Sequence, residues 1–242
     1  MKKYASCLSN IHVLENRQDV TYATFSRLEA DFLCMKKLLE ISGTWKYLIN
    51  LCGQDFPIKS NREIVRELEL RNGTSSISSQ EIKPNKKKWD RYAYSWYADR
   101  EATTKIKQSY KIVNRPFAGK WYRSKGQNKM ASYPRKKSSK MKFAKIYAGN
   151  AYNVFSRGFL DWSFTDDLAQ SIIKWSKDTF SPDEMVWGTL IRLENAPGYS
   201  KNQSKSLTNI ARKIMWAWVR LCHLIFKDNI IEVFEEITLT FA

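Results

Sequence analysis

A carboxylate at the start of a predicted helix is the residue best placed for acid–base chemistry. Ser181-Pro182-Asp183-Glu184 precedes an apolar stretch, and Ser-x-x-Glu is the pattern of a capping box. Glu184 is then the third helical residue, where the positive end of the helix dipole favours the ionised carboxylate. Such a group can act as a general base and take the proton of a reacting hydroxyl. A Glu that only caps the helix has the same spacing, and spacing alone favours the cap.

A second candidate carboxylate follows a predicted strand. Residues 45–51 have a strand-like pattern, and Cys52-Gly53-Gln54-Asp55-Phe56-Pro57 interrupts it before another predicted helix. In a parallel α/β sheet, ligands bind beyond the carboxyl ends of the strands. Asp55 is therefore a candidate site residue by position, although Asp at a strand exit is equally a common turn former.

The positive charge of the chain is concentrated in one segment. The net charge is +17, and residues 83–145 hold 20 Lys and Arg against 3 Asp and Glu, whereas the remainder holds 21 of each. Trp and Tyr interleave with these cations, as they do where phosphate or sulfate groups and flat rings are bound. The simpler interpretation is a solvated loop whose charge keeps the protein soluble. No nucleic-acid partner is expected, because no nucleic-acid-binding motif accompanies the charge.

Composition argues against a metal site and a membrane span. The four cysteines form no Cys-x-x-Cys pair, and two histidines add little to a zinc ligand set. No apolar run reaches the roughly 18 residues that a membrane helix needs, and no signal peptide opens the chain. Two Asn-x-Ser/Thr acceptors for N-glycosylation, at Asn72 and Asn202, fit a lumenal protein, but such short patterns also arise by chance.

The first 82 residues alternate between the periods of strands and helices. Residues 11–14 are a short apolar run suited to a strand, and residues 24–39 carry one apolar helical stripe. Residues 45–51 are the next strand, and Ser60-Asn61-Arg62-Glu63 begins a helix with a capping box. This order predicts an α/β fold with a parallel sheet.

The remainder is less regular until residue 151. Residues 73–146 show no sustained period, which predicts a long irregular excursion with a hairpin around residues 92–97. A strand over residues 151–155, a helix over about 166–175 and a helix following Ser181 to Glu184 complete the prediction. We divide the chain into residues 1–82, a basic aromatic-rich insertion (83–146), residues 147–218 and a C-terminal segment (219–242).

Several segments, in order, resemble one enzyme family. They are Tyr22-Ala23, Ser26-Arg27, Ala30-Asp31, Cys34-Met35, the run from Trp45 to Lys59, Asn61 with Glu63-Ile64-Val65, Ala151-Tyr152, and the run from Asp178 to Glu184 with Trp187. Together they resemble the core 2 and I-branching β-1,6-N-acetylglucosaminyltransferases. The resemblance covers roughly residues 5–80 and 147–218. It implies that residues 1–82 are the nucleotide-sugar-side region, residues 147–218 the acceptor and catalytic region, and residues 219–242 a divergent C-terminal tail.

The resemblance implies a Golgi membrane enzyme with a lumenal GT-A-like (Rossmann-like) domain. Such an enzyme transfers N-acetylglucosamine from UDP-N-acetylglucosamine to O6 of the GalNAc in Galβ1-3GalNAc O-glycans, with inversion and without a metal cofactor. The chain contains no Asp-x-Asp, the pair that would hold a divalent cation on the donor pyrophosphate. Glu184 matches the family's general base. Because of this match, we prefer the general base to the helix cap as the interpretation of Glu184.

The resemblance also suggests acceptor contacts. Glu81, Lys88 and Trp216 fall near the family's galactose-binding Glu, Arg and Trp, and Trp218 stands where the family has Tyr. A Lys in place of Arg loses bidentate geometry toward sugar hydroxyls, and a Trp in place of Tyr loses a hydroxyl. Acceptor choice among core 2, core 4 and I-branching is left open.

The ends of the chain depart from the family pattern. Nothing from Val219 to Ala242 resembles the segment that grips UDP, and the chain begins after the family's first strand and membrane anchor. We therefore expect a fold incomplete at both ends and no useful transfer by this chain as given. Cys7 and Cys34 would lack their family partners. The alternative interpretation is a non-catalytic module that binds sulfated glycans or other polyanions through residues 83–145.

Overall fold

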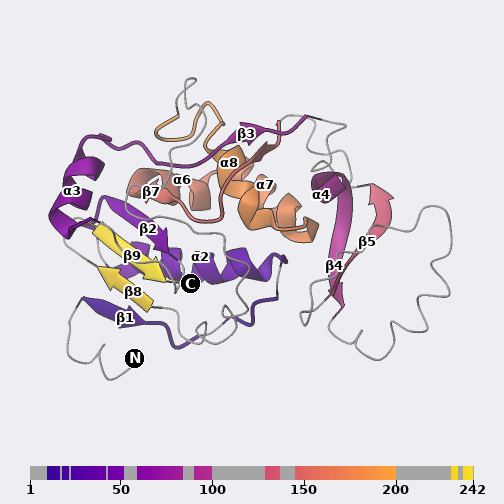
Figure 1. The fold of residues 1–242 in the computed structure, drawn as a ribbon, viewed down its shortest axis with the longest axis horizontal. Helices are drawn as coiled ribbons and strands as arrows, with labels where there is room; N and C mark the ends of the chain where they lie inside the picture. The colour runs from indigo at the N-terminus through magenta and orange to yellow at the C-terminus, as the bar shows by residue number, and fades with distance from the viewer. Residues whose placement is uncertain are drawn as a thin grey trace.

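A five-stranded mixed sheet forms one side of the fold, with strand order β1-β8-β9-β2-β7 (Figure 1). Its strands are β1 (Ile11–Val13), β8 (Ile230–Val233), β9 (Ile237–Phe241), β2 (Tyr47–Leu51) and β7 (Val154–Ser156). The computed structural model describes residues 10–16, 18–21, 23–41, 43–51, 59–83, 90–99, 129–136, 145–199, 230–233 and 237–241. The mixed α/β class is as predicted.

The prediction of a parallel sheet is wrong for three of the four strand pairs in this sheet. Only β2 and β9 pair in parallel, whereas β1–β8, β8–β9 and β2–β7 are antiparallel. β1 and β2 run in the same direction, as alternating strands and helices require, but β8 and β9 lie between them. These two strands come from residues 219–242, which we predicted to be a divergent tail. Local periodicity near the N-terminus carries no information about strands that far along the chain.

Helix α2 (Ser26–Ile41) forms where the apolar stripe predicted it. Leu28, Met35 and Leu38 are fully buried, and the opposite face carries exposed lysines. Trp45 donates its indole N–H to the carbonyl of Leu38 over 3.1 Å, which ties the end of α2 to the segment entering β2. Of the predicted stripe, Leu28 and Met35 are fully buried, and Phe32 and Leu39 are partly buried against the same core.

Helix α3 (Asn61–Glu69) begins at the predicted capping box. Ser60 accepts from the backbone N–H of Glu63 over 3.4 Å, and the Glu63 carboxylate accepts from the backbone N–H of Ser60 over 2.8 Å. Ile64 and Leu68 are buried against β2 residues. In this helix, the Ser-x-x-Glu pattern describes a true N-terminal cap.

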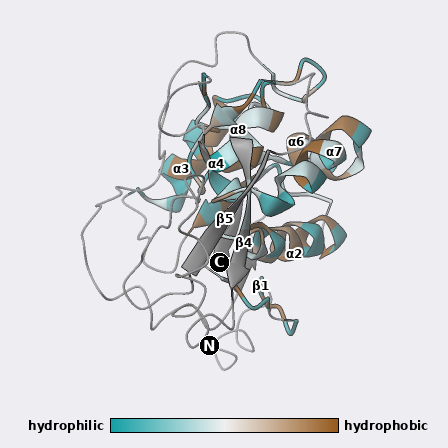
Figure 2. Ribbon diagram, turned by 90° about the vertical axis from the view of Figure 1, so that its right-hand side faces the viewer, coloured by the Kyte–Doolittle hydropathy of each residue, from teal (hydrophilic) through white to brown (hydrophobic). Residues whose placement is uncertain are grey.

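The helices of the second half enclose an aromatic core. They are α6 (Arg157–Thr165), α7 (Asp167–Trp175) and α8 (Val186–Leu190), with the 3₁₀ turns η1 (Ser176–Asp178) and η2 (Pro182–Glu184) between α7 and α8. Trp187 is fully buried and lies 4.7 Å from the ring of Phe155 and 6.4 Å from that of Phe159, measured between centroids. Figure 2 shows apolar and polar residues along α2, α6 and α7. The predicted helix over 166–175 is confirmed, with Asp166 as its N-cap.

Two further sheets have two strands each. β3 (Gln80–Glu81) pairs with β6 (Tyr147–Ala148), and β4 (Tyr94–Asp99) pairs antiparallel with β5 (Lys129–Lys136). The predicted hairpin over residues 92–97 is wrong in extent, because α4 (Asp90–Ala93) precedes β4 and the partner strand starts only at Lys129. Within the described ranges, no helix is both long and apolar enough to cross a membrane.

Candidate functional site

The turn that carries Glu184 is held at both ends by backbone hydrogen bonds. Ser181 donates its N–H to the carbonyl of Ala23 over 2.9 Å, just before α2 begins. The carbonyl of Glu184 accepts from the N–H of Gly149 over 2.7 Å, just after β6. The turn is thereby fixed between an element near residue 23 and one near residue 149. No cap of a following helix is needed to hold Glu184 in place.

The capping box predicted at Ser181 does not form. Ser181 has φ 48° and ψ 63°, and its side chain makes no cap hydrogen bond. A capping residue needs extended dihedrals, and its backbone N–H must be free for the Glu carboxylate, whereas Ser181 gives that N–H to Ala23. η2 has three residues, and α8 begins only at Val186. Glu184 is therefore not at the third position of an α-helix, and its carboxylate does not cap.

The Glu184 carboxylate instead pairs with Arg91. Arg91 Nη1 lies 2.7 Å from Glu184 Oε2, and the two side chains keep 25% and 42% of their surface exposed. Arg91 belongs to α4, and its guanidinium also lies 5.1 Å from the ring centroid of Phe180. The Arg91 carbonyl accepts from the N–H of Phe180 over 3.4 Å. A solvent-reachable carboxylate is thus held in one orientation by a cation that is itself stacked.

Beneath the turn lies a buried ionic cluster. Arg27 Nη1 contacts Asp31 Oδ1 at 2.5 Å, with 16% and 1% of these side chains exposed. The guanidinium of Arg27 also lies 5.2 Å from the ring centroid of Tyr152. Burial would lower the pKa of Arg27, but attraction to Asp31, Tyr152 and Asp183 outweighs it and raises that pKa. The cation of α2 therefore interacts with the turn through Asp183.

Asp183, next to Glu184, is partly buried and interacts electrostatically with Arg27. Burial raises the pKa of Asp183 to about 6, although the Arg27 guanidinium opposes that shift. Burial likewise raises the pKa of Tyr92 to about 12, against the opposing effect of Arg91. Strong pKa shifts cluster at functional sites, and here they surround one turn.

Two residues with unfavourable backbone angles meet at this turn. Ala23 has φ 59° and Ser181 has φ 48°, and they are joined by the hydrogen bond from Ser181 N–H to Ala23 O. A left-handed conformation in a residue other than glycine costs on the order of 1 to 3 kcal/mol and persists only where neighbouring contacts enforce it. Such strain is typical of functional turns.

Comparison with known proteins decides the family. The family model described as "Branch: Core-2/I-Branching enzyme" matches residues 1–234. The chain belongs to the Core-2/I-branching enzyme family. The match is wider than the predicted 5–80 and 147–218 ranges, and it includes strand β8, which lies in the segment that we predicted to be divergent.

Curated relatives of this Core-2/I-branching domain are N-acetylglucosaminyltransferases. A human β-1,3-galactosyl-O-glycosyl-glycoprotein β-1,6-N-acetylglucosaminyltransferase is 33% identical over 218 residues, which are 88% of this chain and 44% of the relative. A mouse enzyme with the same name and the number 4 is 36% identical over 214 residues, 88% of this chain and 42% of the relative. The chain spans less than half the length of these relatives. The alternative of a polyanion-binding module has no support among them.

One other predicted residue of the Core-2/I-branching domain lies in the described ranges. Glu81 is exposed on β3, where it contacts Lys145 at 3.5 Å, and its partner strand β6 leads directly to Gly149. Asp55, Lys88, Trp216 and Trp218 lie outside the described residues.

No group of three His, Cys, Asp or Glu within the described ranges could hold a metal ion. Cys34 is a buried free thiol, and burial raises its pKa to about 12.

Arg91 is the member of the site that sequence reasoning missed. It lies in the basic segment, where it is one of 20 cations, and nothing in its spacing ties it to a carboxylate 93 residues later. In the sequence, Arg91 lies between Trp89 and Tyr92 and does not differ from the other cations of this mixed aromatic and basic segment. The contact with Glu184 is what singles it out.

The turn depends on a close backbone approach at Gly149. A Cβ added there would lie 2.1 Å from the carbonyl oxygen of Ser78. We expect Gly149→Ala to lower the free energy of unfolding by about 1 to 3 kcal/mol, because backbone rather than a flexible side chain must move. Urea denaturation followed by tryptophan fluorescence measures this loss.

Gly43→Ala is the matched control. A Cβ at Gly43 meets nothing within 4 Å, and Gly43 has no positive φ. Its free energy of unfolding should stay the same or rise by less than about 1 kcal/mol. Equal losses at the two glycines would show that close packing at Gly149 does not hold the turn.

Proposed function

We propose that this chain carries the acceptor-side catalytic part of a β-1,6-N-acetylglucosaminyltransferase in the Golgi lumen. The reaction transfers N-acetylglucosamine from UDP-N-acetylglucosamine to O6 of GalNAc in Galβ1-3GalNAc, with inversion and without a metal. The sheet and its covering helices are then part of a GT-A-like domain. The observation that carries the proposal is the Arg91–Glu184 pair, because it leaves a positioned carboxylate that has no capping role.

The general base in this proposal is Glu184. Arg91 binds Oε2, and Oε1 has no hydrogen-bond partner among the described residues. Oε1 accepts the proton of the acceptor O6 as that oxygen attacks C1 of the donor sugar. The bond from C1 to the β-phosphate oxygen breaks, and UDP leaves with the electron pair. One displacement of this kind inverts the anomeric carbon, so a single base is sufficient.

Arg91 keeps this carboxylate in place for the reaction. A near-attack geometry requires reacting atoms about 3 to 3.5 Å apart, and displacement by 1 Å can lower the rate about a hundredfold. The stack of Arg91 on Phe180, and the buried cluster below Asp183, restrict the turn in two directions. Glu81, Lys88, Trp216 and Trp218 are assigned to acceptor binding, and Asp55 to the donor side, through the family resemblance.

A transfer assay tests the proposal. The protein is a chimera in which the flanking segments of the human relative complete this chain, because the chain covers 44% of that relative. We expect Galβ1-3GalNAc to gain one N-acetylhexosamine by mass spectrometry, and we expect a metal chelator to leave the rate unchanged. The same acceptor without its O6 hydroxyl should give no product. A chimera that melts cooperatively but forms no product would contradict the proposal.

A further inference from the structure

The turn after α3 is a two-residue turn of the type I′ class. Asn72 has φ 44° and Gly73 has φ 82°, and Thr74 donates its N–H to the carbonyl of Arg71 over 3.0 Å. Positive φ at both central residues defines this turn, and Asn-Gly is its preferred pair. Gly73 also donates its N–H to the hydroxyl of Tyr47 over 2.6 Å. The turn conformation alone therefore explains why Asn and Gly occupy positions 72 and 73.

Thr74 completes a chemical pattern beyond the turn. Asn72-Gly73-Thr74 is an acceptor sequence for N-linked glycosylation, in which the hydroxyl two residues after Asn is required. Both Asn72 and Thr74 are exposed. The Thr74 hydroxyl donates to the carbonyl of Arg71 over 2.7 Å at the surface, so it remains reachable.

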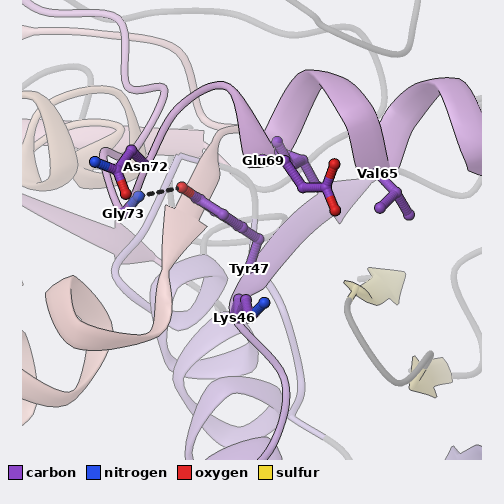
Figure 3. A pocket seen from close by; sticks show the side chains of 7 residues that line it. Lys46, Tyr47, Val65, Glu69, Asn72 and Gly73 are labelled. Carbon is purple, nitrogen blue, oxygen red and sulfur yellow. Dashed lines mark hydrogen bonds between the residues drawn. The ribbon is translucent and has the colours of Figure 1, made fainter.

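The Asn72 side chain is exposed at the rim of a pocket that it lines together with Lys46, Tyr47, Val65 and Glu69. Figure 3 shows its amide nitrogen on the side away from Val65 and Glu69. The turn backbone is packed on its other side, where a Cβ at Gly198 would lie 3.3 Å from Thr74 Cα. A large group on the amide nitrogen can therefore leave into solvent without displacing the turn.

We propose that Asn72 is a site of N-linked glycosylation. This glycosylation rests on the proposed function in one respect, because the protein must enter the secretory lumen to be modified. The Asn72 amide nitrogen forms a bond to C1 of an oligosaccharide donated from a polyisoprenyl pyrophosphate. The bond from C1 to the pyrophosphate breaks, the amide loses one proton, and the lipid pyrophosphate leaves.

The glycan would not obstruct the candidate active site. The turn follows α3 at one end of the molecule, whereas α4, which carries Arg91, lies at the other end (Figure 1). A glycan on Asn72 is hydrophilic and covers the surface around α3, where Leu70 is a strongly exposed apolar residue. We therefore expect it to affect solubility and secretion and to leave turnover unchanged.

The test uses the full-length protein expressed in mammalian cells with Asn202→Gln, which removes the second acceptor sequence. Peptide mass spectrometry after amidase release of N-glycans should find Asn72 converted to Asp. Thr74→Ala should abolish this conversion, and Thr74→Ser should restore it. These two variants leave Asn72 and its φ untouched, so a folding failure at Asn72 cannot imitate the result.

The outcomes separate this proposal from the proposed function. An unmodified Asn72 in protein that reaches the Golgi overturns the glycosylation site and leaves the transferase proposal intact. Protein found outside the secretory pathway overturns both. Conversion that persists in Thr74→Ala overturns the assignment as well, because deamidation of Asn-Gly without a glycan would give the same mass.

Discussion

Glu184→Gln should lower turnover by about 100- to 10,000-fold while the melting temperature barely changes. Gln keeps the size and one acceptor oxygen of the side chain, but it cannot take the proton of the acceptor O6. The stability cost is small because the Glu184 carboxylate caps no helix and is 42% exposed. The rates are measured in the chimera with saturating donor and acceptor.

Glu63→Gln is the control that this chain offers. Glu63 is a true capping-box residue, since its carboxylate accepts from the backbone N–H of Ser60. This variant should melt at a slightly lower temperature than the parent and keep the parent turnover. The two Glu→Gln changes are chemically identical, so opposite effects on rate and stability separate a base from a cap. A Glu184→Gln variant with more than about a tenth of the parent rate means that the base lies elsewhere.

Arg27→Met should lower the free energy of unfolding more than Gly149→Ala does. Asp31 has 1% of its side chain exposed, and Arg27 is its ion-pair partner. Removal of one member of a buried pair commonly costs about 3 to 5 kcal/mol, because the other charge stays without compensation. Burial already raises the pKa of Asp31, and the Arg27 guanidinium opposes that shift. In the Arg27→Met variant, no guanidinium opposes the rise in the pKa of Asp31.

A double variant shows whether the loss comes from the unpaired charge. Arg27→Met with Asp31→Leu removes both charges and should recover most of the stability, as replacement of a whole buried pair often does. Urea denaturation of the parent, both single variants and the double variant gives the coupling free energy. A double variant that loses the sum of the single losses would contradict the account of this cluster.

Helices were predictable from this sequence because their determinants are local. The apolar stripe of α2 and the Ser60–Glu63 capping box of α3 each lie within a few residues, and both were found where expected. Ser181–Glu184 matches the same Ser-x-x-Glu pattern as Ser60–Glu63 but has a different structure. Contacts with Ala23 and Gly149, remote in sequence, decide that conformation. Pattern alone cannot separate these two cases.

The sheet and the site depend on distant contacts, and there the predictions were incomplete. β8 and β9 pair with β1 and β2 across about 190 to 220 residues of sequence, so a local period cannot place them. The family resemblance led to Glu184, but it did not lead to Arg91, which is recognised only when the chain is folded. Arg27 and Asp31 lie in segments that resemble the family, but the sequence did not predict that they are buried beneath the turn.

The linkage in the product tests the central claim most directly. NMR spectroscopy of the trisaccharide made by the chimera from Galβ1-3GalNAc reports the anomeric configuration of the new sugar and the carbon that carries it. A single displacement assisted by Glu184 predicts N-acetylglucosamine in β linkage to C6 of GalNAc. An α linkage would contradict inversion through one base, and attachment to any other carbon would contradict the assignment of O6 as the nucleophile.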